Sequence, residues 1–244
     1  MTKKILETLL LDQTTGKKIL WANAEYKDEP INPAQIDLIK PRYEKERELQ
    51  KLRTKARAEI FTPPEVCNIQ NDLVDGNPNR WQDYVDAKFL EITCGEAPYL
   101  VSRYNAVTGE PIEIENRVGL LDRKLRVVNK ETKILDDWKD FALRAVQSVY
   151  GYEIQGDNLF LARKNVFDTF KDYYREKFSK EPPEELLREV AEIISWNLWQ
   201  MDGLTYSPPF YESANLFGGA NCRIKDWRTG EIVEFIELLK RDGR

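Results

Sequence analysis

The fold is decided by one stretch of the chain, Phe89-Leu90-Glu91-Ile92-Thr93-Cys94-Gly95-Glu96-Ala97-Pro98. Residues 89–93 predict a short buried strand, because they combine aromatic, aliphatic and β-branched side chains. Residues 94–98 place a glycine and a proline close together, which predicts a tight turn. We expect the turn to lead into a helix through residues 99–101. The stretch is therefore a strand, turn and helix unit.

A second helix and strand are predicted farther along the chain. Between residues 136 and 150 apolar side chains recur at the spacing of one helix face: these are Trp138, Phe141, Ala142, Ala145, Val146 and Val149. Gly151 is expected to end this helix. Residues 152–154 are then expected to form a short strand.

The same alternation continues toward the C-terminus. Asp157 is expected to cap a helix, and Pro182 and Pro183 open another. A strand is expected near residues 198–201. Strands that alternate with helices predict an α/β fold, namely a parallel sheet with helices on both faces.

The composition supports one main domain. The chain has 244 residues, of which 41% are hydrophobic, enough for one sizeable core and a modest appendage. We assign residues 1–57 to an N-terminal appendage with a basic helix, and residues 58–244 to the main domain. Charged residues make up 32%, no apolar run approaches the length of a membrane span, and the N-terminus lacks a signal-peptide pattern. We expect a cytoplasmic protein that does not insert into a membrane.

Missing residue types exclude several chemistries. The chain has no histidine, which excludes Ser-His-Asp triads and H-E-x-x-H metal sites. Its three cysteines, Cys67, Cys94 and Cys222, are far apart, so neither a disulfide framework nor a zinc cluster is indicated. No metal is expected. Methyl transfer from a sulfonium to an amine remains open, because it needs positioning more than imidazole chemistry.

A local excess of positive charge lies in residues 40–57. This segment contains eight Lys or Arg residues and three Glu residues, while the whole chain has a net charge of -5. One reading is a solvated helix with paired charges. The other is a contact to the phosphate backbone of DNA.

Two acids and one glycine suit a nucleotide site. In a parallel α/β sheet a nucleotide lies beyond the carboxyl ends of the strands, against a small-residue turn, with an acid on its ribose. Gly95 supplies the turn, and Glu91 and Glu153 are the acids. A structural turn with surface carboxylates explains these residues equally well, and Glu153 would also suit the ribose of NAD.

Four segments, in this order, resemble the motifs of adenine-N6 DNA methyltransferases of the restriction-modification or phage type. The segments are residues 61–63 (FTP), 91–100 (EITCGEAPYL, similar to D-P-A-C-G-S-G-x-F-L), 150–158 (YGYEIQGDN, similar to I-Y-G-I-E-x-x-x-D-N) and 197–204 (NLWQMDGL, similar to N-I-x-x-G-D-A-L). The resemblance covers about residues 53–204. It implies a Rossmann-like methyltransferase sheet, S-adenosylmethionine as cofactor and DNA as partner.

The resemblance also implies the cofactor contacts. Glu91 would lie near the methionine amino group, Glu153 would bind the ribose, and Asp202 would accept a hydrogen bond from the adenine amino group. The remaining implied contacts are Phe61, Thr62, Pro63, Thr93, Cys94, Gly95, Ala97 and Leu204.

Two features depart from the family pattern. Ala97 stands where the motif has a second glycine. Glu91 and Glu153 are also 62 positions apart (153 minus 91), against about 20 in a usual nucleotide site. We therefore expect an insertion, about residues 105–149, to protrude after the first helix. Its basic side chains would face DNA or solvent: they are Arg123, Lys124, Arg126, Lys130 and Lys133.

The segment Ser207-Pro208-Pro209-Phe210 matches the family's catalytic N/D/S-P-P-Y/F tetrapeptide. In the family the tetrapeptide binds the target amino group and stacks on the flipped base. Yet Ser207 follows Asp202 by only five positions (207 minus 202), too few for a helix and another parallel strand. A Pro-Pro turn is the better reading, and a catalytic site is the alternative.

The true tetrapeptide would then come from elsewhere. Three explanations are open: a second methyltransferase chain supplies the tetrapeptide, this chain is a piece of a longer protein, or the enzyme has decayed. A different class of function also fits: a non-catalytic DNA-binding or regulatory subunit that keeps the fold. A third reading is a nucleotide-binding protein of unrelated chemistry.

Overall fold

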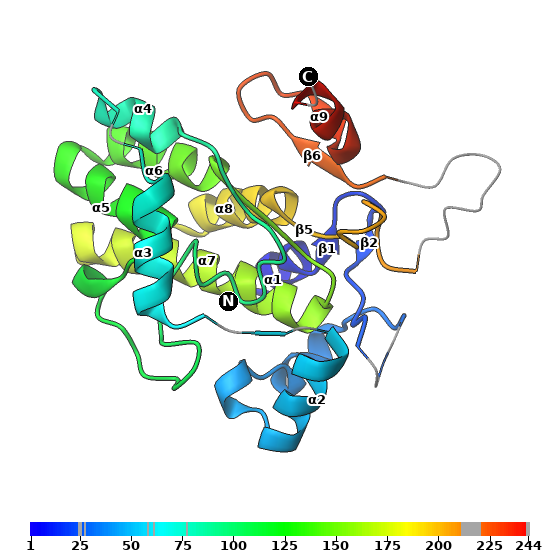
Figure 1. The fold of residues 1–244 in the computed structure, drawn as a ribbon. Helices are drawn as coiled ribbons and strands as arrows, with labels where there is room; N and C mark the ends of the chain where they lie inside the picture. Colours follow the sequence, from blue (N-terminus) through cyan, green and yellow to red (C-terminus); the bar gives the residue numbers. More distant parts are fainter. Residues whose placement is uncertain are drawn as a thin grey trace.

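A computed structural model describes residues 1–23, 26, 28–57, 59–60, 62–76, 78–210 and 221–242. The helices are α1 (Lys3–Leu9), α2 (Arg47–Arg57), α3 (Pro64–Val74), α4 (Trp81–Asp86), α5 (Leu120–Glu131), α6 (Leu135–Gln147), α7 (Gly156–Phe178), α8 (Glu184–Asn197) and α9 (Phe235–Asp242), with 3-10 turns η1 (Pro33–Leu38), η2 (Arg42–Glu44) and η3 (Ile114–Asn116). The strands are β1 (Leu11–Asp12), β2 (Lys17–Lys18), β3 (Phe89–Glu91), β4 (Val149–Glu153), β5 (Leu198–Gln200), β6 (Arg223–Lys225) and β7 (Ile232–Glu234). Figure 1 shows their arrangement.

The centre of the fold is a parallel sheet in the order β3-β4-β5. Leu90 pairs with Tyr150, and Tyr152 pairs with Trp199. All five residues of β4 are buried, as expected for the middle strand of a parallel sheet covered on both faces. The chain is therefore α/β, with a three-stranded parallel sheet flanked by helices, and this is compatible with a Rossmann-like fold.

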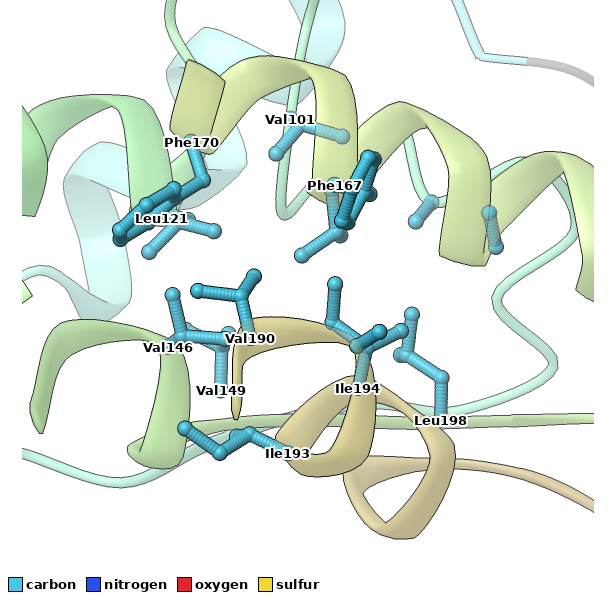
Figure 2. Close-up of a cluster of buried hydrophobic side chains, with 14 of the residues drawn as sticks. Val101, Leu121, Val146, Val149, Phe167, Phe170, Val190, Ile193, Ile194 and Leu198 are labelled. Carbon is cyan, nitrogen blue, oxygen red and sulfur yellow. The ribbon is translucent and has the colours of Figure 1, made fainter. Parts of the chain in front are cut away.

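The main core lies between the sheet and the helices α5 to α8. Figure 2 shows Phe167 and Phe170 of α7 on the side of the core opposite Val190 and Ile194 of α8. All four side chains are at most 1% exposed. The helical spacing predicted between residues 136 and 150 is confirmed as α6, whose apolar side chains enter this core.

Different elements pack against the opposite face of the sheet. Tyr150, Tyr152 and Trp199 project from it into a second apolar cluster. The antiparallel hairpin β6–β7 and helix α9 close this cluster, with Ile224 and Phe235 as buried members. The prediction of helices on both faces is therefore correct only in part, because a hairpin shares the second face with one helix.

Several local predictions need correction. Residues 99–101 form turns rather than a helix, and the next helix along the chain is α5. Gly151 does not end a helix but lies within β4. There a Cβ atom would come within 3.2 Å of Cys94 Sγ and 2.9 Å of Leu198 Cδ2, so a glycine lets the turn pack onto the strand. Asp157 is not a cap, because α7 already begins at Gly156.

The expected protruding insertion is part of the core. Residues 105–149 contain α5 and α6, which connect β3 to β4 and bury Leu121, Leu125 and Trp138. The expectation of a protrusion was wrong because it rested on the long sequence distance between Glu91 and Glu153. The apolar face of each helix instead packs into the core.

The N-terminal segment contributes side chains to the main core. Ile5, Leu9 and Ile19 belong to the main core cluster. The guanidinium of Arg163, fully buried in α7, donates to the carbonyls of Leu9 and Leu11 as well as to carbonyls of α8 and β5. Within the described part of the chain, no helix combines the length and apolar character needed to cross a bilayer.

Candidate functional site

A cavity of about 250 Å³ lies at the carboxyl ends of β3 and β4. Its lining includes six of the residues predicted to hold the cofactor: Thr62, Glu91, Thr93, Cys94, Gly95 and Glu153. Three segments that are distant in sequence thus meet at one place, where parallel α/β folds bind small molecules. The volume lies just below the range of about 300–1,000 Å³ usual for ligand pockets.

Five of the eleven predicted contacts are not in the described lining, and three of these five belong to the two segments nearest the cavity. Pro63 precedes α3 as its N-cap residue, one position beyond Thr62. Ala97 is completely buried beneath the turn, so it shapes the turn rather than the cavity surface. Phe61 lies outside the residues that the structure describes.

The turn after β3 has an unusual backbone. Thr93, Gly95 and Ala97 all have positive φ, at 46°, 54° and 63°. This region suits glycine and costs energy for Thr and Ala, and such strain is often found at functional sites. The Ala97 amide donates to the Cys94 carbonyl at 2.7 Å, which closes the turn. A small side chain at position 97 therefore serves the packing of the turn.

Glu153 ties this turn to the neighbouring strand. Its Oε2 accepts from the Gly95 amide at 2.9 Å, and its Oε1 accepts from the Gln155 amide at 2.9 Å. Burial raises the pKa of Glu153, although both backbone donors act in the opposite direction. A carboxylate has about four lone-pair sites, so Glu153 keeps acceptor capacity for a hydroxyl in the cavity.

Glu91 holds the far end of the same turn. Its carboxylate oxygens accept from the Tyr99 amide at 3.3 Å and from the Leu100 amide at 3.2 Å. These bonds tie the turns at residues 98–100, which stand where a helix was predicted, to the end of β3. Burial, helped by the charge of Glu153, raises the pKa of Glu91 to about 8.

The cavity has an acidic lining. Three carboxyl groups belong to it, those of Glu59, Glu91 and Glu153, and no Lys or Arg stands among the described residues of the lining. The Gly95 amide is already occupied by Glu153, and no helix begins at the turn. The Gly95 amide is therefore not free for a ligand, whereas the first turn of α7 reaches the cavity through Gln155 and Asn158.

Comparisons with protein-family models, curated proteins and solved structures find no match to this chain. The chemistry of the cavity therefore provides the functional argument.

Sequence reasoning missed Glu59, which forms one wall of the cavity. Its Oε2 accepts from Arg53 Nε at 2.5 Å and from Gln155 Nε2 at 3.2 Å. Arg53 and Lys45 also pair with Asp157, at 2.8 and 3.4 Å. Part of the positive charge of residues 40–57 is thus buried in ion pairs with Glu59 and Asp157. The sequence signal for the pairing of Arg53 and Lys45 was Asp157, an acid in the first turn of α7.

The other basic side chains that were considered for DNA are mostly used internally. Lys124 is fully buried and donates to the carbonyls of Val85 and Ala87 and to the Ser148 hydroxyl. Arg123 pairs with Asp72 and Asp75 of the α3 segment. A DNA-facing role for Lys124 is therefore excluded by its burial.

Asp202 and Leu204 do not reach the cavity. One Asp202 carboxylate oxygen accepts from the Leu204 amide at 2.8 Å, and the Asp202 amide donates to the Ser207 carbonyl at 2.9 Å. The Leu204 residue is 91% exposed. The carboxylate of Asp202 thus caps its own turn after β5, on the side of the sheet farthest from β3.

The segment Ser207–Phe210 belongs to the same turn. Asp202 and Ser207 form an isolated antiparallel bridge, Pro208 and Pro209 are buried, and Phe210 is 56% exposed. None of these residues lines the cavity. The reading of this segment as a Pro-Pro turn agrees with its position, because β4 and β5 separate it from the turn after β3.

Proposed function

We propose that this chain supplies the S-adenosylmethionine pocket of a DNA adenine-N6 methyltransferase. The observation that carries the proposal is the acidic cavity at the carboxyl ends of β3 and β4, which gathers Thr62, Glu91, Thr93, Cys94, Gly95 and Glu153. These residues come from three of the four segments that resemble the family's motifs.

The lining of the cavity suits this cofactor better than a dinucleotide. The carboxyl oxygens of Glu91 would accept hydrogen bonds from the ammonium group of S-adenosylmethionine. The pyrophosphate of NAD would find no Lys or Arg among the described residues of the lining. Glu153 would hold the ribose hydroxyls, which are common to both ligands.

In this proposal the chain's residues bind and orient the cofactor, and the catalytic tetrapeptide comes from a second chain or from a C-terminal extension. Ser207 and Phe210 lie in the turn beyond β5, whereas the methyl group would lie near the turn after β3. A target amino group oriented by Ser207 would therefore not reach the sulfonium. Effective transfer needs reacting atoms about 3–3.5 Å apart.

DNA would be held partly by the exposed face of residues 40–57. Lys40, Arg47, Lys51 and Lys55 are exposed, after the internal use of Lys45 and Arg53. Four positive side chains are a modest site for a phosphate backbone, so we expect weak and salt-sensitive binding by this chain alone.

The rival from another class is a non-catalytic subunit that keeps a ligand pocket for regulation. Both readings use the same cavity, so ligand binding does not distinguish them. Methylation of DNA by the chain together with a partner that carries the tetrapeptide would distinguish them.

The first experiment is calorimetry with S-adenosylmethionine and NADH. Heat only with S-adenosylmethionine supports the proposal.

A further inference from the structure

A second pocket lies at the amino-terminal end of the parallel sheet, at the opposite end of β3 and β4 from the acidic cavity. Its volume is about 460 Å³, within the range of about 300–1,000 Å³ usual for ligand pockets. We call it the basic pocket. Its described lining includes Asp86, Lys88, Arg144, Tyr150, Trp227 and Arg228.

The basic pocket has more positive than negative charge. Arg144 and Arg228 share the single carboxylate of Asp86, with Arg144 Nε 2.9 Å from Oδ1 and Arg228 Nη2 3.1 Å from Oδ2. The ammonium group of Lys88 pairs with Asp226 at 2.9 Å. Three cations thus share two carboxylates, although the whole chain has a net charge of -5.

The two guanidinium groups keep hydrogen-bond donors for a ligand. Each guanidinium has five N–H donors. Arg144 uses Nε and Nη2 for Asp86, and Arg228 pairs with Asp86 alone among the described residues. Their side chains are 42% and 62% exposed. The remaining N–H groups are therefore accessible to an acceptor that enters from solvent.

Two aromatic side chains complete the pocket, and both are held in place. Trp227 Nε1 donates to Asn197 Oδ1 at 2.7 Å. The same Asn197 side chain donates to the carbonyls of Val146 and Val149, so the indole is anchored to the core. Tyr150 belongs to β4 and is only 8% exposed. Aromatic side chains beside cations suit a ligand that combines a planar ring with a phosphate, because bases stack on such rings.

We propose that the basic pocket binds a small nucleotide through its phosphate group. Arg144 and Arg228 would donate to the phosphate oxygens, since a guanidinium matches the geometry of phosphate, and Trp227 would contact the base. The site is independent of the proposed function, because no described residue lines both the basic pocket and the acidic cavity.

The arrangement of the cations favours a small ligand over duplex DNA. A DNA backbone is held by a stripe of Lys and Arg that contacts several phosphates in succession. Arg144 and Arg228 instead converge on one point, the carboxylate of Asp86. They are therefore placed for one phosphate group.

Calorimetry with adenosine 5′-monophosphate as the probe tests the proposal. We expect saturable binding by the wild-type chain. Inorganic phosphate and adenosine should each bind at least about tenfold more weakly, because each lacks one of the two recognised groups.

A matched pair of variants locates the site. Arg228→Ala should weaken binding of the monophosphate at least about tenfold, as expected for the loss of hydrogen bonds to a charged group. Lys139→Ala makes the same change of charge on the helix that carries Arg144. It should bind like the wild type, because Lys139 pairs with Glu189 at 3.6 Å and lies outside the described lining. Urea unfolding verifies that the variants are as stable as the wild type.

A third variant reverses the direction of the effect. Asp86→Asn removes the negative charge that a phosphate would meet, while its amide oxygen still accepts from Arg144. We expect about fivefold tighter binding of the monophosphate, from the loss of one like charge at short range. A merely structural role of Asp86 would give unchanged or weaker binding.

Several results would overturn the proposal. These are no saturable heat with the monophosphate, equal effects of Arg228→Ala and Lys139→Ala, adenosine that binds as tightly as the monophosphate, unchanged or weaker binding by Asp86→Asn, or tighter Arg228-dependent binding of a short DNA duplex. Binding that saturating S-adenosylmethionine abolishes would place the monophosphate in the acidic cavity and would also overturn the proposal. Calorimetry with S-adenosylmethionine alone reports separately on the proposed function.

Discussion

The backbone amide of Gly95 donates a 2.9 Å hydrogen bond to the carboxylate of Glu153. This bond joins the turn after β3 to the end of β4, across 58 positions of the sequence. It fixes the shape of the cavity and leaves the Gly95 amide unavailable to a ligand.

Replacement of Glu153 by Gln tests this bond. In Glu153→Gln one acceptor oxygen becomes an amide nitrogen, which cannot accept from Gly95 or Gln155. We expect a loss of about 1–3 kcal/mol in the free energy of unfolding, because a buried donor remains unsatisfied. Urea unfolding measures it. The control is Glu113→Gln at an exposed position, which should change stability by less than about 0.5 kcal/mol. Equal effects of the two changes would refute the role of Glu153.

The stability of the fold should depend on pH through Glu91. Its pKa rises from an ordinary value of 4.5 to about 8 on folding, so the folded chain holds this proton more tightly than the unfolded chain. The stabilisation is complete below about pH 4.5 and is lost as the pH rises through about 8. Relative to wild type, Glu91→Gln should therefore gain stability between pH 5 and 8, with a slope of at most about 1.4 kcal/mol per pH unit.

Urea unfolding of wild type and Glu91→Gln at several pH values measures this slope. The difference between the two chains removes the contribution of groups that titrate in both, such as Asp122, whose pKa burial raises to about 6. A difference that stays constant from pH 5 to 8 would show that Glu91 does not titrate in this range.

Lys124 should be a structural residue. Its buried ammonium satisfies the Val85 and Ala87 carbonyls at the end of α4, and burial lowers its pKa to about 7. Lys124→Ala leaves these acceptors unpaired and opens a cavity, so we expect a loss of about 3–5 kcal/mol. Thermal unfolding compares it with Lys130→Ala, an exposed change on the same helix. A similar melting temperature for both variants would contradict the burial of Lys124.

The isolated chain should not methylate DNA. The segment that matches the tetrapeptide, residues 207–210, is not in the described lining of the cavity, and misplacement alone can remove many orders of magnitude of rate. The measurement is transfer of tritiated methyl from S-adenosylmethionine to unmethylated genomic DNA. Robust incorporation that disappears in Ser207→Ala/Phe210→Ala would instead make residues 207–210 the catalytic motif.

The sequence predicts best what depends on neighbouring residues. The strand at residues 89–91 and the turn with Gly95 follow from local side-chain types, and the order of strands and helices follows from periodicity. The position of Glu153 at the end of β4 follows from the same reading. These elements are sufficient to place the cavity.

Features that depend on distant partners were not predictable. The pairing of Arg53 with Glu59 and Asp157 joins three segments, and a charge pattern alone does not distinguish an inward-facing arginine from a solvated one. Likewise, the Glu91 bonds to the Tyr99 and Leu100 amides join residues that the sequence reading had not connected. Asp202 was predicted from its motif to contact the cofactor's adenine, whereas in the structure its carboxylate caps a tight turn.

The cofactor pocket is tested most directly by calorimetry of the purified chain with S-adenosylmethionine, its demethylated product and NADH. We expect saturable heat with S-adenosylmethionine and none with NADH. We also expect weaker binding by Glu153→Gln and nearly unchanged binding by Asp202→Ala, because Asp202 lies outside the cavity lining. No heat with S-adenosylmethionine or its demethylated product from a folded chain, or tighter binding of NADH, would contradict the claim.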